Sequence, residues 1–462
     1  MILNFGRDRF IVVAVTSLFA SVFFAHYIFI YTPLGGLDAQ RFMLVSFMCL
    51  LALCLSILLD WRGTLVVLAS VAVSILFGWV VYEPLTKHIT YLFLIFTLVV
   101  CFAFLFDCEV ARESIAGVVA FCSILSMLLA VVCAFAYLNT GIGLLWREIF
   151  AFVSNVRFLN HFHVAVFLVL AYYVVSSTGY KKYFFFLGLS SIFFVALISA
   201  GRGVWVSMLF GVICLSFFIR DRDELIRLLM VLFISLLLGL LFFNIFERVA
   251  VAGESVVGLS VRKNLFSGAR PTIWMQTVEA ILERPIFGHG AYSFALDGIM
   301  SARTPAHPHQ HFLQLAYEYG LVVAVAVYGC IASFFIRTAL KVREDKNFFA
   351  GVTLASLAAL LVNAQYSGVF TMPLGQLFLA THFGLLLGYS RWGGISLVGW
   401  RALATRRGGM VPIWLSIAFA ISGYYWAVIL VDYAGGFQGQ PIRFSVPHEK
   451  LFFFPRTWDN AS

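Results

Sequence analysis

Charged side chains are scarce in this chain of 462 residues. Asp, Glu, Lys and Arg make up 11% of the residues, whereas hydrophobic residues make up 62%. Soluble domains contain about 25% charged residues and about 45–50% apolar residues. Charged side chains normally cover much of a surface that faces water, and so few of them cannot cover a soluble protein of this size. The composition excludes a soluble globular fold and indicates an integral membrane protein.

Several cofactor and partner signatures are missing as well. The 8 cysteines lie in or beside apolar stretches, and none belongs to a Cys-x-x-Cys pair. This spacing predicts neither a disulfide framework nor a cysteine-based metal site. The chain also has no P-loop and no dinucleotide fingerprint. We therefore expect no cofactor and no resident metal. We also expect no nucleic-acid partner, because in a membrane protein the formal charge of +9 mainly reports orientation.

Long apolar stretches predict an all-α polytopic integral membrane protein with about 12 or 13 transmembrane helices, since about 17 to 25 apolar residues cross a bilayer. The candidate spans are residues 10–31, 42–59, 64–82, 89–106, 115–137, 161–176, 183–200, 203–219, 225–246, 312–336, 348–370, 374–389 and 410–432. The count is 12 or 13 because 374–389 is short. In addition, only Gly201 and Arg202 separate two of the other spans.

The basic residues of the short connections predict the orientation. Most of them fall on one side, for example at Arg7, Lys181, Arg343 and Arg406, and the positive-inside rule assigns that side to the cytoplasm. The long polar segment then lies in the periplasm, where we expect it to carry short amphipathic helices. The expected organisation is N-terminal transmembrane helices at 1–160, further helices with the Arg202 turn at 161–246, the periplasmic loop at 247–311, C-terminal helices at 312–432 and a periplasmic tail at 433–462.

Arg202 stands between Gly201 and Gly203 on a tight turn at the membrane edge. Two interpretations are open for this turn. The arginine could be an interfacial residue whose head group reaches water. Alternatively, the glycines could let a phosphate approach while the guanidinium binds it through two parallel hydrogen bonds.

A second arginine, Arg270, begins a short amphipathic pattern in the periplasmic loop. Pro271 suits the first turn of a helix, Trp274 and Leu282 belong to its apolar face, and Pro285 ends the pattern. An arginine beside free backbone N–H groups favours an anion such as phosphate. The alternative is a surface arginine near a Trp that anchors the helix in the membrane. Two guanidiniums could together stabilise a departing diphosphate.

Three histidines alternate at His307, His309 and His311. In an extended segment their imidazoles could share one face, so a zinc site is one alternative. Histidines at the membrane interface without a chemical role are another. We favour the third reading, in which one histidine is a general base, because a neutral imidazole can take a proton from a sugar hydroxyl near neutral pH.

Further polar residues could line the same cavity. Glu318 falls in the candidate span 312–336, where an ionisable group usually faces a cavity or a partner, and it could orient His309 or Arg202. His161 and His163 open another span from the same side of the membrane.

These motifs together resemble the O-antigen ligase family. The resemblance rests on Arg202 in G-R-G-x-W, Arg270 in R-P-x-x-W, and His309 followed by Gln310, Phe312-Leu313-Gln314, Glu318 and Gly320, and it covers roughly residues 155 to 390. It implies an inner-membrane glycosyltransferase, with its active site facing the periplasm, that takes a glycan from undecaprenyl diphosphate and passes it to a sugar of the lipid A core. It also implies that His309 is the essential histidine and that Arg202 and Arg270 hold the diphosphate. We expect the substrates to contact His307, His311, Glu318, Gln314, His161 and His163 as well.

The expected reaction is a metal-independent single displacement that inverts the anomeric carbon. Because the family core is shared, an O-antigen polymerase or a protein O-oligosaccharyltransferase remains an alternative. A transporter of an anionic lipid or solute is an alternative of a different class. It would be expected to have charged or broken helices near the middle of the membrane, whereas the motif residues here lie towards one face.

Overall fold

The computed structural model describes residues 109–140, 156–199, 201–251, 270–290, 293–296 and 307–390, together with residues 15–23 and single positions before residue 107. The expected spans at 64–82 and 410–432 and the tail at 433–462 lie outside the described residues. Those at 42–59 and 89–106 are described at single positions.

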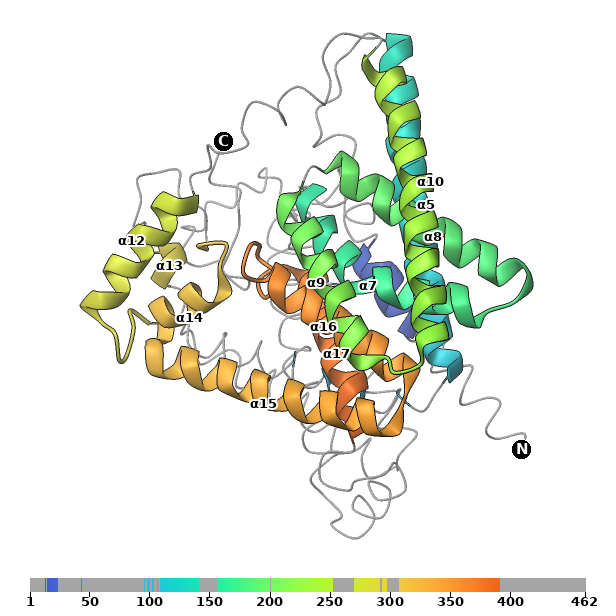
Figure 1. The fold of residues 1–462 in the computed structure, drawn as a ribbon. Helices are drawn as coiled ribbons and strands as arrows, with labels where there is room; N and C mark the ends of the chain where they lie inside the picture. Colours follow the sequence, from blue (N-terminus) through green and yellow to red (C-terminus); the bar gives the residue numbers. More distant parts are fainter. Residues whose placement is uncertain are drawn as a thin grey trace, which may run out of the picture.

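All regular secondary structure in this part of the chain is helical (Figure 1). The helices are α5 (Glu109–Thr140), α7 (Val156–Ser176), α8 (Gly179–Ile198), α9 (Arg202–Phe218), α10 (Arg222–Val251), α12 (Arg270–Glu283), α13 (Ser293–Leu296), α14 (His311–Tyr319), α15 (Leu321–Asp345), α16 (Phe348–Asn363) and α17 (Pro373–Ser390). Among the described residues, α5, α7, α8, α10 and α15 are long and apolar enough to cross a membrane. The all-α polytopic membrane fold is therefore confirmed.

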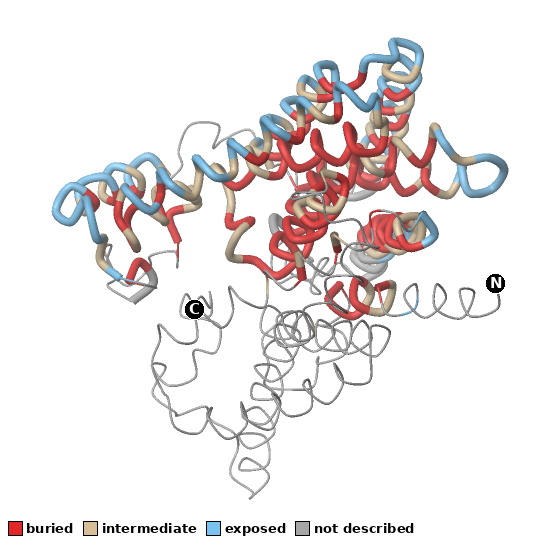
Figure 2. The backbone as a smooth tube through the Cα atoms, turned by 90° about the horizontal axis from the view of Figure 1, so that it is seen from below, coloured by how far each residue is buried: buried red, intermediate tan, exposed pale blue. Residues whose placement is uncertain are grey.

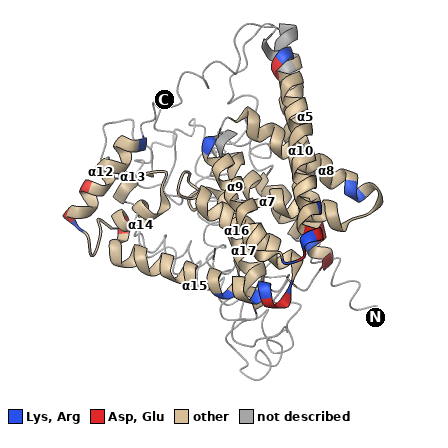
Figure 3. Ribbon diagram, viewed as in Figure 1, with Lys and Arg blue, Asp and Glu red and all other residues tan. Residues whose placement is uncertain are grey.

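Charged residues gather near the ends of the long helices (Figure 3). In α15 no charged residue precedes Arg337, and in α10 none lies between Arg227 and Glu247. This distribution suits helices in hydrocarbon, where a charged side chain is costly. Large apolar side chains on α10 and α15 are correspondingly exposed, whereas α7, α16 and α17 consist mostly of buried residues. Figure 2 shows the buried residues gathered in the middle of the described part and the exposed residues along its outer edges.

The inner helices pack closely where a small residue faces another helix. α16 packs against both α9 and α7, and α8 packs against α5, α7 and α10. A methyl group added at Gly211 of α9 would lie 2.9 Å from the Cβ of Ala359 in α16. Small residues permit such close approach between membrane helices. The side-chain amide of Asn363, the last residue of α16, donates to Ser207 Oγ at 3.3 Å, so the start of α9 lies against the end of α16.

The expected span at 312–336 is wrong in one respect, because the chain breaks at Gly320 into α14 and α15. Gly320 has φ 87° and ψ 162°, a conformation open essentially to glycine alone. A Cβ there would lie 1.9 Å from the carbonyl oxygen of Ile286. The span therefore begins at Leu321, and Glu318 lies on a separate short helix rather than inside the span.

The amphipathic helix predicted after Pro271 is present as α12, but its packed face differs from the expected one. Ile273, Thr277 and Ile281 are buried, whereas Leu282 is 69% exposed. The buried face packs on α14, in an apolar cluster that includes Phe294, Ala316, Tyr317 and Ala324.

The turn after α12 is joined to the break between α14 and α15. Backbone hydrogen bonds run from the N–H of His289 to the oxygen of Tyr317 (2.8 Å), from Gly290 to Glu318 (2.9 Å) and from Leu321 to Pro285 (2.7 Å). The imidazole of His289 also stacks on the ring of Tyr317. These contacts make α12, the turn and α14 one packed unit at the start of α15.

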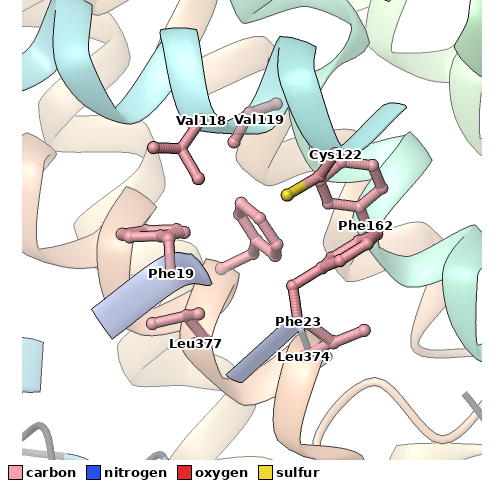
Figure 4. Close-up of a pocket in the computed structure, with 9 residues that line it drawn as sticks. Phe19, Phe23, Val118, Val119, Cys122, Phe162, Leu374 and Leu377 are labelled. Atoms are coloured by element: carbon pink, nitrogen blue, oxygen red, sulfur yellow. The ribbon is translucent and has the colours of Figure 1, made fainter. Parts of the chain in front are cut away.

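An apolar pocket lies between residues 15–23, α5, α7 and α17 (Figure 4). Its lining residues are Phe19, Phe23, Val118, Val119, Cys122, Phe162, Leu374, Leu377 and Phe378. Apart from the thiol of Cys122, this lining has no ionisable group. The pocket therefore offers no acid, base or anion-binding group for glycosyl transfer.

Candidate functional site

The segment 307–311 enters α14 through a helix cap and a left-handed residue. Gln310 is the N-cap, and its side-chain oxygen accepts a hydrogen bond from the backbone N–H of Leu313. His309, directly before it, is half-buried and has φ 55°. Non-glycine residues rarely adopt such a conformation, which costs on the order of 1–3 kcal/mol and persists only where the surrounding structure holds it in place.

His307 packs against the loop between α16 and α17. Its side chain is buried, and its Nδ1 accepts a hydrogen bond from the backbone N–H of His309 at 3.1 Å. The centroids of the two imidazole rings are 4.3 Å apart. A Cβ at Gly368 would lie 2.8 Å from both Cε1 and Nε2 of His307. The glycine thus leaves the space that the imidazole fills.

His311 also contacts this loop, at Ala364 and Phe370. Its backbone N–H donates to the oxygen of Ala364 (3.1 Å), and its ring stacks on Phe370 with centroids 3.6 Å apart. Its Nδ1 lies 3.0 Å from the hydroxyl oxygen of Tyr328. That oxygen also accepts a hydrogen bond from the side-chain amide of Gln365 at 2.8 Å.

The rings of His307 and His309 adjoin one another, whereas the ring of His311 is stacked on Phe370. In the part of the chain that the structure describes, no three His, Cys, Asp or Glu side chains are grouped so that they could hold a metal ion. The alternative of a zinc site has no support from this geometry.

The loop between α16 and α17, residues 364–372, is the element that the sequence motifs missed. We expected residues up to 370 to continue a span, but α16 ends at Asn363. The loop contacts four positions of the candidate site: it reaches His311 through Ala364 and Phe370, Gly203 through Tyr366, His161 through Ser367 and His307 through Gly368. The run of small and polar residues at 364–368, between two apolar stretches, is the signal that could have indicated it.

The first turns of α7 hold both this loop and the turn before α9. His161 is fully buried, and its Nε2 lies 2.6 Å from the Oγ of Ser367. The side-chain oxygen of Asn160 accepts a hydrogen bond from Ser199 Oγ at 2.9 Å. His163 is buried beside the ring of Phe162, and no described residue forms a hydrogen bond with its imidazole. The structure therefore brings His161 to the loop 364–372, and a contact of His163 with the substrates stays a prediction.

Arg202 is the first residue of α9, and its side chain is exposed. The N-cap of α9 is Gly201, which has no side chain to cap the helix. A Cβ at Gly201 would lie 2.7 Å from Nδ2 of Asn160, and one at Gly203 would lie 3.0 Å from Cβ of Tyr366. Both glycines thus make room for neighbouring protein atoms, and their role in the approach of a phosphate stays a prediction.

Arg270 is the first residue of α12, and Trp274 follows one turn later. The indole Nε1 of Trp274 donates a hydrogen bond to the backbone oxygen of Pro308 at 2.9 Å. The indole therefore links α12 to the residue before His309, which the alternative of a membrane anchor does not account for.

Gln314 and Glu318 are buried on α14. The backbone N–H of Gln314 donates to the oxygen of Gln310 (3.1 Å), and the backbone oxygen of Glu318 accepts from Gly290. That the carboxylate of Glu318 orients His309 or Arg202 stays a prediction.

The site as a whole combines two helix starts with the half-buried imidazole of His309. Arg202 begins α9, whose first turn touches the loop 364–372, and Arg270 begins α12, which touches the segment 307–311 through Trp274. A helix N-terminus favours an anion, and a guanidinium can add two hydrogen bonds to a phosphate. Chemically, this arrangement combines groups suited to a phosphorylated ligand with a group suited to proton transfer.

Comparison with known proteins agrees with this description. Residues 183–328 match a family model described as O-antigen ligase. A comparison with curated proteins finds no relative that matches the chain. The matched segment runs from α8 into α15 and contains Arg202, Arg270 and His309, whereas His161 and the loop 364–372 lie outside it. The match supports membership of this chain in the O-antigen ligase family.

Proposed function

We propose that the protein transfers a glycan from undecaprenyl diphosphate to a sugar hydroxyl of the lipid A core, at the periplasmic face of the bacterial inner membrane. The family match supports glycosyl transfer of the O-antigen ligase or polymerase type. The observation that carries the finer proposal is the placement of His309. Its backbone is left-handed, Pro308 before it accepts a hydrogen bond from Trp274 of α12, and Gln310 after it caps α14.

In this proposal His309 is the general base. Its neutral imidazole removes the proton from the acceptor hydroxyl, and the oxygen forms a bond to the anomeric carbon of the donor. The bond from that carbon to the diphosphate oxygen breaks, and its electron pair leaves with the lipid diphosphate. Arg202 and Arg270 stabilise the negative charge that develops there. A single displacement of this kind inverts the anomeric configuration.

The contacts of the other two histidines favour His309 for this role. Nδ1 of His307 already accepts a hydrogen bond from the protein backbone, and Nδ1 of His311 faces the hydroxyl of Tyr328. His307 is also buried, whereas His309 is half-buried. His311 is half-buried as well, but its ring is stacked on Phe370. Only a partly accessible imidazole can meet the hydroxyl of a bound sugar, since a general base must come within hydrogen-bonding distance of the proton it removes.

The test is reconstitution of the purified full-length protein with lipid-linked glycan and lipid A core. We expect His309→Ala and Arg270→Ala to abolish transfer while the protein stays inserted in the membrane at normal abundance. The matched control for Arg270 is Arg284→Ala, because Arg284 is an exposed arginine just beyond α12. Full activity of His309→Ala would refute the assignment of the base.

The product separates the proposal from its alternatives. A glycan attached to lipid A core supports a ligase, whereas a lengthened lipid-linked glycan indicates a polymerase and a glycosylated protein indicates an O-oligosaccharyltransferase. Movement of an anionic lipid across vesicles without any glycan transfer would indicate a transporter instead.

A further inference from the structure

The side chain of His307 forms a hydrogen bond with the backbone two residues further along the chain. Nδ1 of His307 accepts from the N–H of His309 at 3.1 Å. Pro308 between them has no N–H, so that of His309 is the first backbone donor after His307. The connectivity is that of an Asx turn, in which a side-chain acceptor at position i binds the N–H of residue i+2. Here an imidazole nitrogen replaces the usual carbonyl or carboxylate oxygen.

This hydrogen bond determines the chemical state of the His307 ring. A ring nitrogen that accepts a hydrogen bond must carry a lone pair, so Nδ1 is unprotonated and the ring is neutral with its proton on Nε2. Protonation of Nδ1 would turn the acceptor into a donor facing another donor. His307 can therefore hold the backbone of His309 only as a neutral ring that takes up no proton.

Gly368 next to His307 and Trp274 next to Pro308 hold this turn in place. Gly368 leaves the space for the imidazole, since a Cβ there would lie 2.8 Å from Cε1 and Nε2. In addition, Trp274 donates a hydrogen bond to the backbone oxygen of Pro308 at 2.9 Å. The left-handed φ of His309 is thus maintained by contacts to both residues that precede it.

We propose that His307 is a positioning residue, whose imidazole holds the backbone of His309 in the left-handed conformation that presents the His309 ring to the acceptor sugar. The proposal rests on the proposed function, in which His309 is the base. It assigns different duties to two adjacent imidazoles: His309 exchanges a proton, and His307 accepts a backbone hydrogen bond throughout.

A matched pair of variants separates the acceptor from the rest of the ring. In His307→Asn the side-chain oxygen Oδ1 takes the place of Nδ1 in the side chain, so the hydrogen bond is kept although the side chain cannot titrate. In His307→Leu the volume is similar but the acceptor is lost. For glycan transfer we expect kcat to fall at least about 10-fold in the Leu variant and no more than about 5-fold in the Asn variant, since one buried hydrogen bond corresponds to roughly a 10-fold effect. KM for the lipid-linked donor should change less than about 2-fold in both, because the arginines that would bind the diphosphate are untouched.

The pH dependence of kcat distinguishes a positioning residue from a base. In His307→Asn the decrease in rate towards acid pH should persist, because His309 still titrates. Loss of that acid limb in the Asn variant would show that His307 is the titrating base and would overturn the proposal. Equal activity of the Leu and Asn variants would overturn it as well.

A second measurement does not depend on activity. Hydrogen exchange of the His309 amide, resolved by fragmentation of the peptide in the mass spectrometer, reports the hydrogen bond itself. We expect exchange at least about 10-fold faster in His307→Leu than in His307→Asn, because only the Asn variant keeps an acceptor. Equal exchange in the two variants would refute the positioning role even where glycan transfer is confirmed. If the wild-type protein transfers no glycan but the exchange rates differ as expected, the proposed function fails while the hydrogen bond is verified.

Discussion

Replacement of Gly320 by alanine should separate the packed unit around α12 from the start of α15. Gly320 lies at φ 87° and ψ 162° between α14 and α15, and a Cβ there would lie 1.9 Å from the carbonyl oxygen of Ile286. The methyl group cannot be accommodated by a side-chain rotation, because the atoms it meets belong to the backbone. Either the turn after α12 or the junction of α14 and α15 has to move.

Two contributions set the magnitude of the effect. An alanine in this region of backbone conformation costs about 1–3 kcal/mol. If the turn withdraws, the three backbone hydrogen bonds that join residues 285–290 to residues 317–321 are lost, at about 1 kcal/mol net each. The sum is about 4–6 kcal/mol, and since 1.4 kcal/mol corresponds to a factor of ten, local opening should become roughly three to four orders of magnitude more frequent.

Hydrogen exchange of the amides of His289, Gly290 and Leu321 measures this opening directly. Gly329→Ala is the matched control, because Gly329 lies in α15 and no atom lies within 4 Å of the position of its added Cβ. In the interior of a helix that change should stabilise slightly, by about 1 kcal/mol. If these three amides exchange as slowly in Gly320→Ala as in Gly329→Ala, the explanation of the break between α14 and α15 is wrong.

Three further outcomes are expected. Trp274→Phe removes the N–H that binds the oxygen of Pro308 but keeps an aromatic ring, so we expect kcat for glycan transfer to fall about 10-fold and to fall further in Trp274→Leu. A fully active Phe variant would show that the hydrogen bond between Trp274 and Pro308 has no role in transfer. Ser367→Ala removes the hydroxyl next to Nε2 of His161 and should lower kcat about 10-fold, whereas Ser367→Thr should keep part of the activity because it keeps a hydroxyl. Unchanged kinetics of the Ala variant would show that this contact has no role in positioning the loop 364–372. Activity should persist in a strong chelator, and a loss of activity that zinc restores would contradict the metal-independent reaction.

Hydropathy was enough to predict the spans that are simple in structure. The segments expected at 115–137, 161–176 and 225–246 lie within α5, α7 and α10, because a long apolar stretch without charge has no other stable state in a bilayer. The break at Gly320 could not be predicted in this way. Residues on both sides of it are apolar enough to be averaged into one span, and only the backbone conformation of the glycine separates α14 from α15.

The candidate site, too, could be predicted from the sequence only in part. Arg202, Arg270 and the histidines were visible because polar and charged residues are rare in this chain. The loop 364–372 was not, because its contacts bring together residues that are far apart in sequence, such as His161 and Ser367. Differences between His307 and His309 likewise depend on hydrogen bonds that spacing alone does not reveal.

The central claim is that the lipid diphosphate leaves as His309 takes the proton of the acceptor. The most direct measurement is the amount of lipid diphosphate released per glycan transferred by the purified protein, compared between wild type and His309→Gln. We expect one diphosphate lipid for each glycan transferred by the wild type, and neither product with the Gln variant. Transfer by His309→Gln at the wild-type rate, or transfer without release of a lipid diphosphate, would contradict the account.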